Sequence, residues 1–176
     1  MNLIIKKIID RIYVQQDFDY FVSLCSEKIV FLDELLNLLK EECNSIQIYS
    51  LDSDPSIEIK MSINTSNSQV KYTSILTISK IVKCFYLQHE FEIENPDPDR
   101  MDYYLDSFSD TPYSKQQFRM EEKVINYLEK MDYFRLDFLE IVEPCPQVRK
   151  FKDAPDSQMS VGNAIFSDFW ELCEEG

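Results

Sequence analysis

Residues 57–78 read Ile-Glu-Ile-Lys-Met-Ser-Ile-Asn-Thr-Ser-Asn-Ser-Gln-Val-Lys-Tyr-Thr-Ser-Ile-Leu-Thr-Ile. Apolar and polar residues alternate on both sides of the polar run at 64–68, which has the composition of a turn. Because successive side chains of a strand point to opposite faces, each half would bury one face and leave the other in water. This stretch therefore predicts an antiparallel β-hairpin.

The strand pattern continues on both sides of this hairpin. Residues 46–51 precede it, and residues 85–95 follow it with a clear alternation. One face of the later strand carries Phe85, Leu87, His89, Phe91 and Ile93, and the other carries Tyr86, Gln88, Glu90, Glu92 and Glu94. The links between these strands are too short for helical crossovers, so we expect an antiparallel meander of about four strands.

Helical spacing of apolar residues flanks the strands. Residues 3–14 predict an amphipathic helix with Leu3, Ile4, Ile8 and Ile12 on its apolar side. A second helix is expected from about Ser26 to Asn44, with an apolar stripe of Ile29, Leu32, Leu35, Leu36, Leu39 and Cys43. Residues 17–25 are ambiguous between helix and strand, with helix favoured.

The C-terminal half adds further helices. Ser114 and Gln117 have the spacing of a capping box and open a helix to about Met131, whose inner face would carry Phe118, Val124, Ile125 and Leu128. Residues 133–143 fit a continued helix or a fifth strand, and a last helix is expected at 163–173. We therefore expect one α+β domain over residues 1–176, with an antiparallel sheet of four to five strands packed on one face by N-terminal and C-terminal helices.

The chain is strongly acidic. In its 176 residues, 32 Asp and Glu stand against 18 Lys and Arg, which gives a formal charge of −14. Phosphate backbones and anionic membranes would be repelled, so we expect neither nucleic acid nor membrane as a partner. The short apolar run at the N-terminus contains Lys6, Lys7 and Asp10, which does not fit a secretory signal, and a cytoplasmic location is expected.

The residue types that build common catalytic motifs are scarce. Glycine occurs only at positions 162 and 176, which excludes phosphate-binding loops, dinucleotide fingerprints and nucleophile elbows. The single histidine, His89, falls on the apolar face of its strand and is expected to be a hydrogen-bonded core residue. We therefore expect no enzyme activity, no cofactor and no metal site.

The five cysteines also argue for a plain core role. Their number is odd, they are widely spaced, and no Cys-x-x-Cys pair is present. We expect reduced, buried thiols, which agrees with a cytoplasmic location. Trp170, the only tryptophan, is expected to anchor the C-terminal segment by packing.

The strongest local signal lies between Glu90 and Pro112, where eight acidic residues stand with a single basic one. Residues 95–113 are expected to form a long loop, and such loops are often functional. Aromatic residues among acidic ones are favourable for binding a basic protein, because the rings supply contact area and the negative charge raises the association rate. The predicted partner-binding residues are Asp97, Asp99, Asp102, Tyr103, Tyr104, Asp106, Phe108 and Asp110.

These features favour an acidic protein-binding inhibitor of the immunity or antitoxin type, which would neutralise a basic toxin such as a nuclease by occlusion. Acidity that serves solubility alone, with a solvated loop, is the simplest alternative. A second alternative is a metal-dependent hydrolase with carboxylates at Asp52, Asp54 and Glu58. A third is a structural subunit that associates through an open sheet face.

Overall fold

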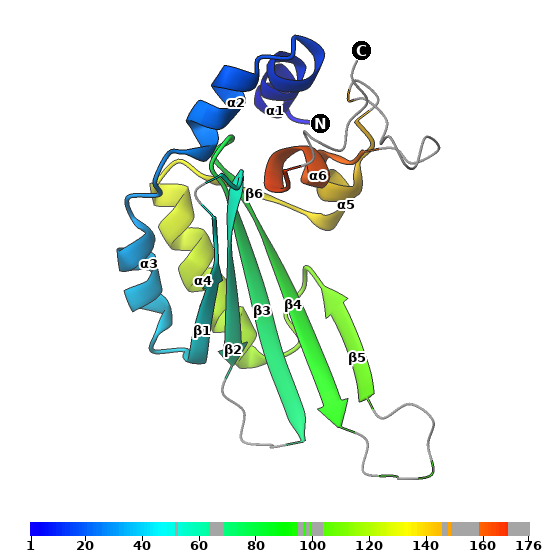
Figure 1. The fold of residues 1–176 in the computed structure, drawn as a ribbon. Coiled ribbons are helices and arrows are strands. Elements are labelled where there is room, and N and C mark those ends of the chain that lie inside the picture. The colour runs from blue at the N-terminus through cyan, green and yellow to red at the C-terminus, as the bar shows by residue number, and fades with distance from the viewer. Residues whose placement is uncertain are drawn as a thin grey trace.

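The fold is seen in a computed structural model that describes residues 1–51, 53–63, 69–94, 97, 99, 104–145, 148 and 159–168. Helices and strands alternate in blocks along the chain (Figure 1). In chain order the elements are α1 Leu3–Ile9, a π-helical turn η1 Asp10–Val14, α2 Phe18–Cys25, α3 Leu32–Leu39, β1 Cys43–Tyr49, β2 Ser56–Ile63, β3 Val70–Ser79, β4 Cys84–Glu94, β5 Tyr104–Ser109, α4 Lys115–Lys130, β6 Phe134–Leu136, α5 Phe138–Val142 and α6 Val161–Phe166.

The strands form one sheet in the order β1-β2-β3-β4-β5, in which every neighbouring pair is antiparallel. The short strand β6 pairs with β4 in parallel and lies off this path. The predicted hairpin is confirmed, since Ile63 pairs with Tyr72 and Ile57 with Ile78. The predicted α+β class with an antiparallel meander is therefore correct.

One face of the sheet is covered by α3 and α4 (Figure 1). The side chains that meet there come from alternate positions of the strands and from one side of each helix. They form a cluster that we call the sheet core: Leu35, Leu39, Ile57, Ile59, Met61, Ile63, Leu76, Ile78, Phe85, Leu87, Met120, Val124 and Leu128. Burial of each such side chain contributes about 1.5–3 kcal/mol, so this layer holds the helices to the sheet.

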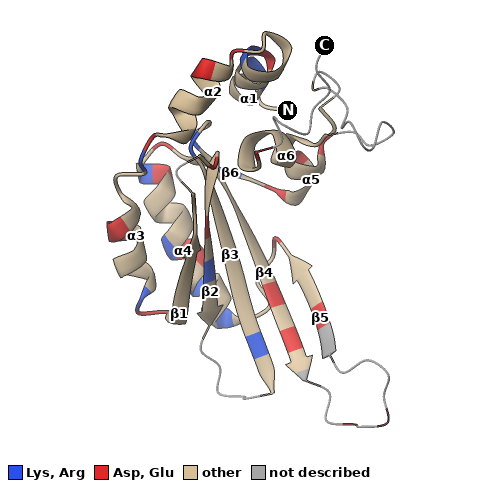
Figure 2. Cartoon of the chain, in the orientation of Figure 1, with Lys and Arg blue, Asp and Glu red and all other residues tan. Residues whose placement is uncertain are grey.

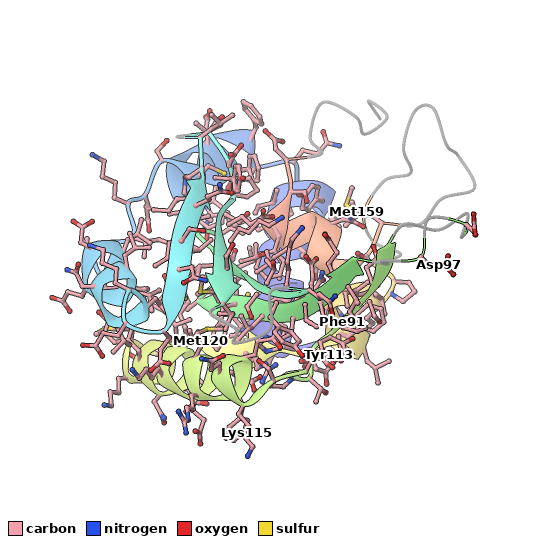
Figure 3. All side chains as sticks on the ribbon, turned by 90° about the horizontal axis from the view of Figure 1, so that it is seen from below. Phe91, Asp97, Tyr113, Lys115, Met120 and Met159 are labelled. Atoms are coloured by element: carbon pink, nitrogen blue, oxygen red, sulfur yellow. The ribbon has the colours of Figure 1, made fainter. Side chains whose placement is uncertain are left out.

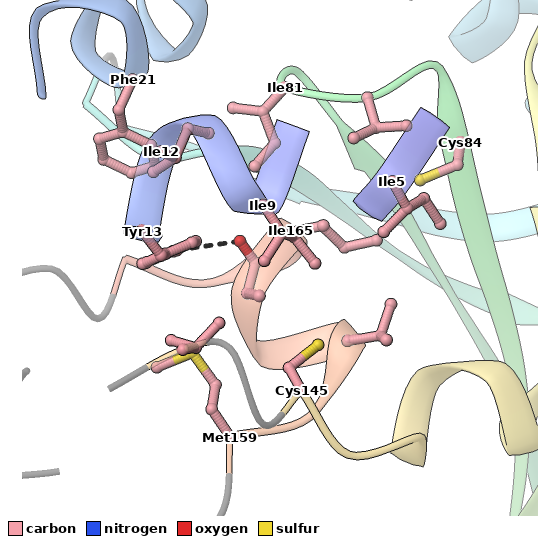
Figure 4. Packing of buried hydrophobic residues seen from close by; sticks show 14 of the residues in the cluster. Ile5, Ile9, Ile12, Tyr13, Phe21, Ile81, Cys84, Cys145, Met159 and Ile165 are labelled. Atoms are coloured by element: carbon pink, nitrogen blue, oxygen red, sulfur yellow. Dashed lines mark hydrogen bonds between the residues drawn. The ribbon is translucent and has the colours of Figure 1, made fainter. Parts of the chain in front are cut away.

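A second cluster, the end core, lies where the strands meet the N-terminal and C-terminal helices (Figure 4). Ile5, Ile9 and Ile12 pack there against Ile165, and the Tyr13 hydroxyl donates a 2.9 Å hydrogen bond to the Ala164 carbonyl. The serine hydroxyls of β2 and β3 secure the same helix. Ser56 donates to the Phe166 carbonyl at 2.7 Å and Ser79 to the Ile165 carbonyl at 2.9 Å.

Several predicted helices are confirmed with changed bounds. The ambiguous residues 17–25 form helix α2, and residues 133–143 divide into β6 and α5. The helix expected from Ser26 to Asn44 covers only Leu32–Leu39, because Cys43 already starts β1, whose ladder with β2 supplies its backbone hydrogen bonds. The last predicted helix is shorter too and ends at Phe166, while Trp170 and Cys173 lie outside the described residues.

Two predicted apolar faces are wrong in part. Leu3 and Ile4 are exposed on α1, whereas Ile5 and Ile9 are buried. On α4, Phe118 is half exposed and Met120 is buried. In both helices apolar residues are too dense for periodicity alone to identify the inner face, which the position of the neighbouring elements decides.

The start of α4 is as predicted. Ser114 caps the helix and forms a reciprocal capping box with Gln117. The fully buried Gln117 side chain also donates through Nε2 to the carbonyls of Thr73 at 3.0 Å and Glu90 at 3.1 Å. One amide therefore joins the beginning of α4 to both β3 and β4.

The loop predicted at residues 95–113 is wrong in its second half, because residues 104–109 form strand β5. This strand pairs with β4 from Tyr104 opposite Glu94 to Ser109 opposite His89. Its mixed sequence of acids, serines and aromatics hides the alternation, and pairing with a long neighbour satisfies its backbone groups. The acidic segment is thus carried partly on the sheet.

Within the described ranges, no helix combines the length and apolarity needed to cross a membrane. Gly162 has an ordinary backbone conformation, but α6 passes so close to α5 at this position that an added Cβ would overlap Ile141 Cγ2. Only hydrogen fits there without movement of the neighbouring helix.

We expect Gly162→Ala to lower the free energy of unfolding by about 1–3 kcal/mol, because the new methyl group overpacks the α5–α6 contact. Ile141→Ala removes the opposing methyl, so the double variant should lose less stability than the sum of the two single variants. Urea unfolding followed by circular dichroism measures all three. Strict additivity would show that the two positions do not meet.

Candidate functional site

The face of the sheet opposite α3 and α4 is largely polar, and within the described residues the end core packs against only one end of it. Its rows follow from strand pairing: Lys71 lies beside Glu92, which lies beside Asp106, and Thr73 lies beside Glu90, which lies beside Phe108. In Figure 2 the red segments of β4 and β5 stand next to the blue segment of β3. Acidic charge is therefore concentrated on the β4–β5 side of this face.

Two like charges are direct neighbours in this arrangement. Glu92 and Asp106 occupy opposite positions on adjacent strands, which is unfavourable in an antiparallel ladder. Lys71 Nζ lies 2.9 Å from Glu92 Oε1 and offsets part of this repulsion. The side chains of Lys71 and Glu92 are well exposed, so this ion pair contributes little stability.

A shallow hollow of about 500 Å³ lies over these rows. The side chains of Lys60 and Lys71 border it on one side, and those of Glu90, Glu92 and Asp106 on the other. Phe108 is 59% exposed at its rim. A rigid aromatic ring among carboxylates offers apolar contact and negative charge at the same place.

Helix α5 extends the apolar part of this surface. It buries none of its residues and exposes Phe138, Leu139 and Val142, which share one side by their spacing. The rings of Phe108 and Phe138 lie 6.4 Å apart, which places this side of α5 next to β5. We call Glu90, Glu92, Asp106, Phe108 and Phe138 together the open-face site.

Asp110 links β5 to α5, the two elements that carry Phe108 and Phe138. Its carboxylate accepts a hydrogen bond from the Phe138 backbone N–H at 3.3 Å, and its carbonyl accepts one from Arg135 Nη2 at 2.8 Å. Arg135 Nη1 in turn lies 2.7 Å from the buried carboxylate of Glu121 on α4. Asp110 thus has an internal role that fixes α5 beside β5, in addition to its predicted role in partner contact.

The prediction that His89 is a hydrogen-bonded core residue is confirmed, and the residue lies beside Glu121. His89 is fully buried, and its Nδ1 lies 2.8 Å from the Ser74 hydroxyl. Its Nε2 lies 3.6 Å from Glu121 Oε1. The order Ser74, His89, Glu121 is that of a hydrolase triad, but all three side chains are buried and a substrate would have no access. The cluster is therefore part of the core.

Burial also affects a neighbouring tyrosine. The Tyr86 hydroxyl is buried without a hydrogen-bond partner among the described residues. Burial raises the pKa of Tyr86, and the negative charge of Asp110 raises it further, while Arg135 acts in the opposite direction. Tyr86, which pairs with Leu136 of β6, therefore remains a neutral packing residue.

Comparison of the chain with protein-family models, curated proteins and solved structures found no match. Its function therefore has to be inferred from the chemistry of the site.

The structure places the predicted partner-binding residues in three settings. Asp106 and Phe108 point to the open face from β5, and Asp110 follows at its end. Asp97 lies in the β4–β5 connection, away from the paired rings of Phe91 and Tyr113 (Figure 3). Asp99 donates its backbone N–H to Asp97 Oδ1 at 3.1 Å. Asp102 and Tyr103 lie outside the described residues, as does the side chain of Tyr104.

Phe138, Glu90 and Glu92 were not among the partner-binding residues predicted from the sequence. The alternation of β4 already placed both glutamates on the wet face. The Asp137-x-x-Glu140 spacing could have predicted that a helix starts at Phe138, and the structure shows a reciprocal capping box there at the start of α5. Its contact with Phe108 had no local signal, because it depends on two elements far apart in the chain.

The alternative carboxylate site has a different character. Asp54 and Glu58 line a hollow of about 670 Å³ near the end of β1, together with Asp168, while Asp52 lies outside the described residues. Asp54 Oδ2 accepts a 2.7 Å hydrogen bond from the Leu51 N–H and so stabilises a turn. No three acidic, cysteine or histidine residues of the described chain are grouped to hold a metal ion.

The described cysteines are free thiols, as predicted. Burial is the main cause that raises the pKa of Cys25, Cys43 and Cys145 to about 11, and it raises the pKa of the fully buried Cys84 further. Cys84 belongs to the end core, while His89 reaches into the interior on the other face of β4. These thiols are protonated near neutral pH and are poor nucleophiles.

We expect Arg135→Met to lower the free energy of unfolding by about 2–4 kcal/mol, because it leaves the Glu121 carboxylate buried without its cation. Glu121→Gln removes that charge, so the double variant should recover part of the loss. Urea unfolding gives the three values. A double variant that is less stable than Arg135→Met alone would argue against this ion pair.

We expect Cys84 to react with iodoacetamide at pH 8 at least about 100-fold more slowly in the folded protein than in the unfolded chain, because burial suppresses the thiolate. Peptide mass spectrometry resolves the sites, and the half-buried Cys43 is the internal comparison and should react faster than Cys84. Rapid alkylation of Cys84 in the folded state would mean that the end core opens readily.

Proposed function

We propose that the protein binds a basic protein partner through the open-face site and neutralises it by occlusion, as an immunity protein neutralises a basic toxin such as a nuclease. The observation that carries this proposal is the exposed Phe108, which stands opposite Glu90 and next to the exposed carboxylate of Asp106. Rings of this kind supply most of the affinity of many protein interfaces, and the surrounding charges supply the rate of encounter.

The apolar part of the surface supports a protein partner over a small ligand. Phe108, Phe138, Leu139 and Val142 are all at least 42% exposed, and they adjoin a hollow that is shallow. Exposed apolar patches with a charged rim are typical of protein–protein interfaces. A small molecule would find little enclosure there.

The charge pattern gives the partner an orientation. Carboxylates dominate the β4 and β5 side of the hollow, whereas Lys60 and Lys71 border it from β2 and β3. A matching surface carries Arg or Lys over β4 and β5 and an acidic or neutral group over Lys60 and Lys71. The net charge of −14 adds long-range attraction to any basic protein.

Inhibition by occlusion needs no chemistry from the inhibitor. The triad-like residues Ser74, His89 and Glu121 are buried, and the thiols of the described cysteines are protonated near neutral pH. A binding role therefore uses what this surface offers, which is shape, apolar contact and negative charge.

We expect Glu92→Gln combined with Asp106→Asn to weaken capture of a basic partner by roughly 10–100-fold at low salt, because two charges that face the partner are lost. The matched control is Glu122→Gln with Glu129→Gln, which removes the same charge from exposed positions of α4. The measurement is a pull-down from lysate of the source cells with elution by a salt step, followed by interferometry on the retained protein.

Equal weakening by both double variants would show that only net charge matters, and the open-face site would lose its assignment. If no basic protein is retained at low salt by the unmodified chain, the acidity serves solubility and the proposed function is wrong.

A further inference from the structure

The two edges of the sheet differ in charge. The edge strand β5 carries Asp106 opposite Glu92, whereas the edge strand β1 carries no charge from Cys43 to Leu51. Proteins commonly block edge strands with charged residues or proline, because the unpaired backbone groups of an edge accept another strand. The β1 edge has no such protection along Asn44–Tyr49.

The β1 edge is accessible over most of its length. Among the described residues β1 pairs only with β2, and Ile48, Tyr49 and Leu51 are 44%, 53% and 66% exposed. A β-bulge between Cys43 and Ser45 disturbs only its beginning. Half of the backbone groups of such a strand point away from the sheet and are free to pair.

The two faces of this edge also differ. Ile46 and Ile48 pair with Met61 and Ile59 and so lie on the side of the sheet that α3 and α4 cover. Gln47 and Tyr49 lie on the open face, where the Tyr49 hydroxyl donates to Gln47 Oε1 at 2.9 Å. An added strand would need apolar side chains on the first face and polar ones on the second.

Both ends of β1 are acidic. Glu41 and Glu42 precede it and share one cation, with Lys123 Nζ at 3.6 Å and 2.6 Å from their carboxylates. The hollow near its other end is lined by Asp54, Glu58 and Asp168, and Lys80 Nζ donates to the Leu51 carbonyl beside it at 3.1 Å, so three carboxylates stand there against one ammonium group. An uncharged strand between acidic ends complements an extended segment that carries basic residues.

We propose that the β1 edge accepts an extended segment of the basic partner as an additional strand of the sheet. This inference rests on the proposed function and adds a second contact to it, since β1 and β5 are opposite edges of one sheet. The segment alternates apolar side chains over Ile46 and Ile48 with Lys, Arg or Thr on the open face. A second copy of this chain fits less well, because an antiparallel β1–β1 pair would bring Glu41 and Glu42 toward the acidic hollow of the other copy.

The test uses a synthetic peptide, Lys-Val-Thr-Val-Lys-Val-Thr blocked at both termini, with the full ¹⁵N-labelled chain. We expect amide exchange of Asn44–Tyr49 to slow by at least roughly tenfold at saturating peptide. The control peptide has the same sequence and charge but is N-methylated at its five central residues, so that the amide groups on neither of its edges can donate to β1. It should cause no slowing.

Two protein variants separate the edge from general charge. Ile48→Lys and Val30→Lys add the same charge, but Ile48 lies on the edge and Val30, which is 92% exposed, precedes α3. We expect Ile48→Lys to abolish the slowing and Val30→Lys to retain it. Thermal unfolding of both variants checks that they are folded.

Several results would overturn strand addition. Equal slowing by the N-methylated peptide would show that backbone pairing is not needed. Changes confined to β4 and β5 would show electrostatic binding at the open-face site. In either case the proposed function would stand without strand addition. Failure of the peptide to protect β1, while a basic partner is still captured, leads to the same conclusion. If the peptide does not protect β1 and no basic partner is captured, both strand addition and the proposed function are wrong. Protection of β1 without peptide that rises with protein concentration would make a second copy the occupant.

Discussion

The ion pair between Glu121 and Arg135 is the interaction on which the rest of the site depends. The Glu121 side chain is only 7% exposed, and a carboxylate buried to this extent needs a cation close to it. Arg135 supplies that cation from β6 and also donates to the Asp110 carbonyl, while Asp110 accepts from the Phe138 N–H. One buried charge therefore positions β6, the end of β5 and the start of α5 relative to α4.

The sheet divides the molecule into a structural side and an exposed side. The sheet core lies on one face, and among the described residues α6 covers only the end of the other face through bonds from Ser56 and Ser79. A contact surface on this face therefore lies on the part of the strands beyond the end that α6 covers. The acidic row there is maintained although Glu92 and Asp106 repel each other, which is expected where charge serves recognition rather than stability.

The sequence predicted those elements whose signals are local. The alternation of residues 57–63 and 70–78 gave the hairpin, and the spacing of Ser114 and Gln117 gave the start of α4. It failed where long-range pairing decides the structure. Strand β5 exists because β4 extends to Glu94 beside it, and Phe138 joins Phe108 only through the folded position of α5. Of the open-face site, Asp106 and Phe108 were therefore predicted from the sequence, while Glu90, Glu92 and Phe138 were not.

In the proposed function a partner covers the open face of the sheet. Hydrogen–deuterium exchange of this chain, measured with and without the captured basic partner, tests it most directly because exchange reports where the backbone becomes protected. We expect protection in residues 86–94, 104–110 and 138–142. Protection confined to α3 and α4, with these three segments unchanged, would contradict binding at the open face.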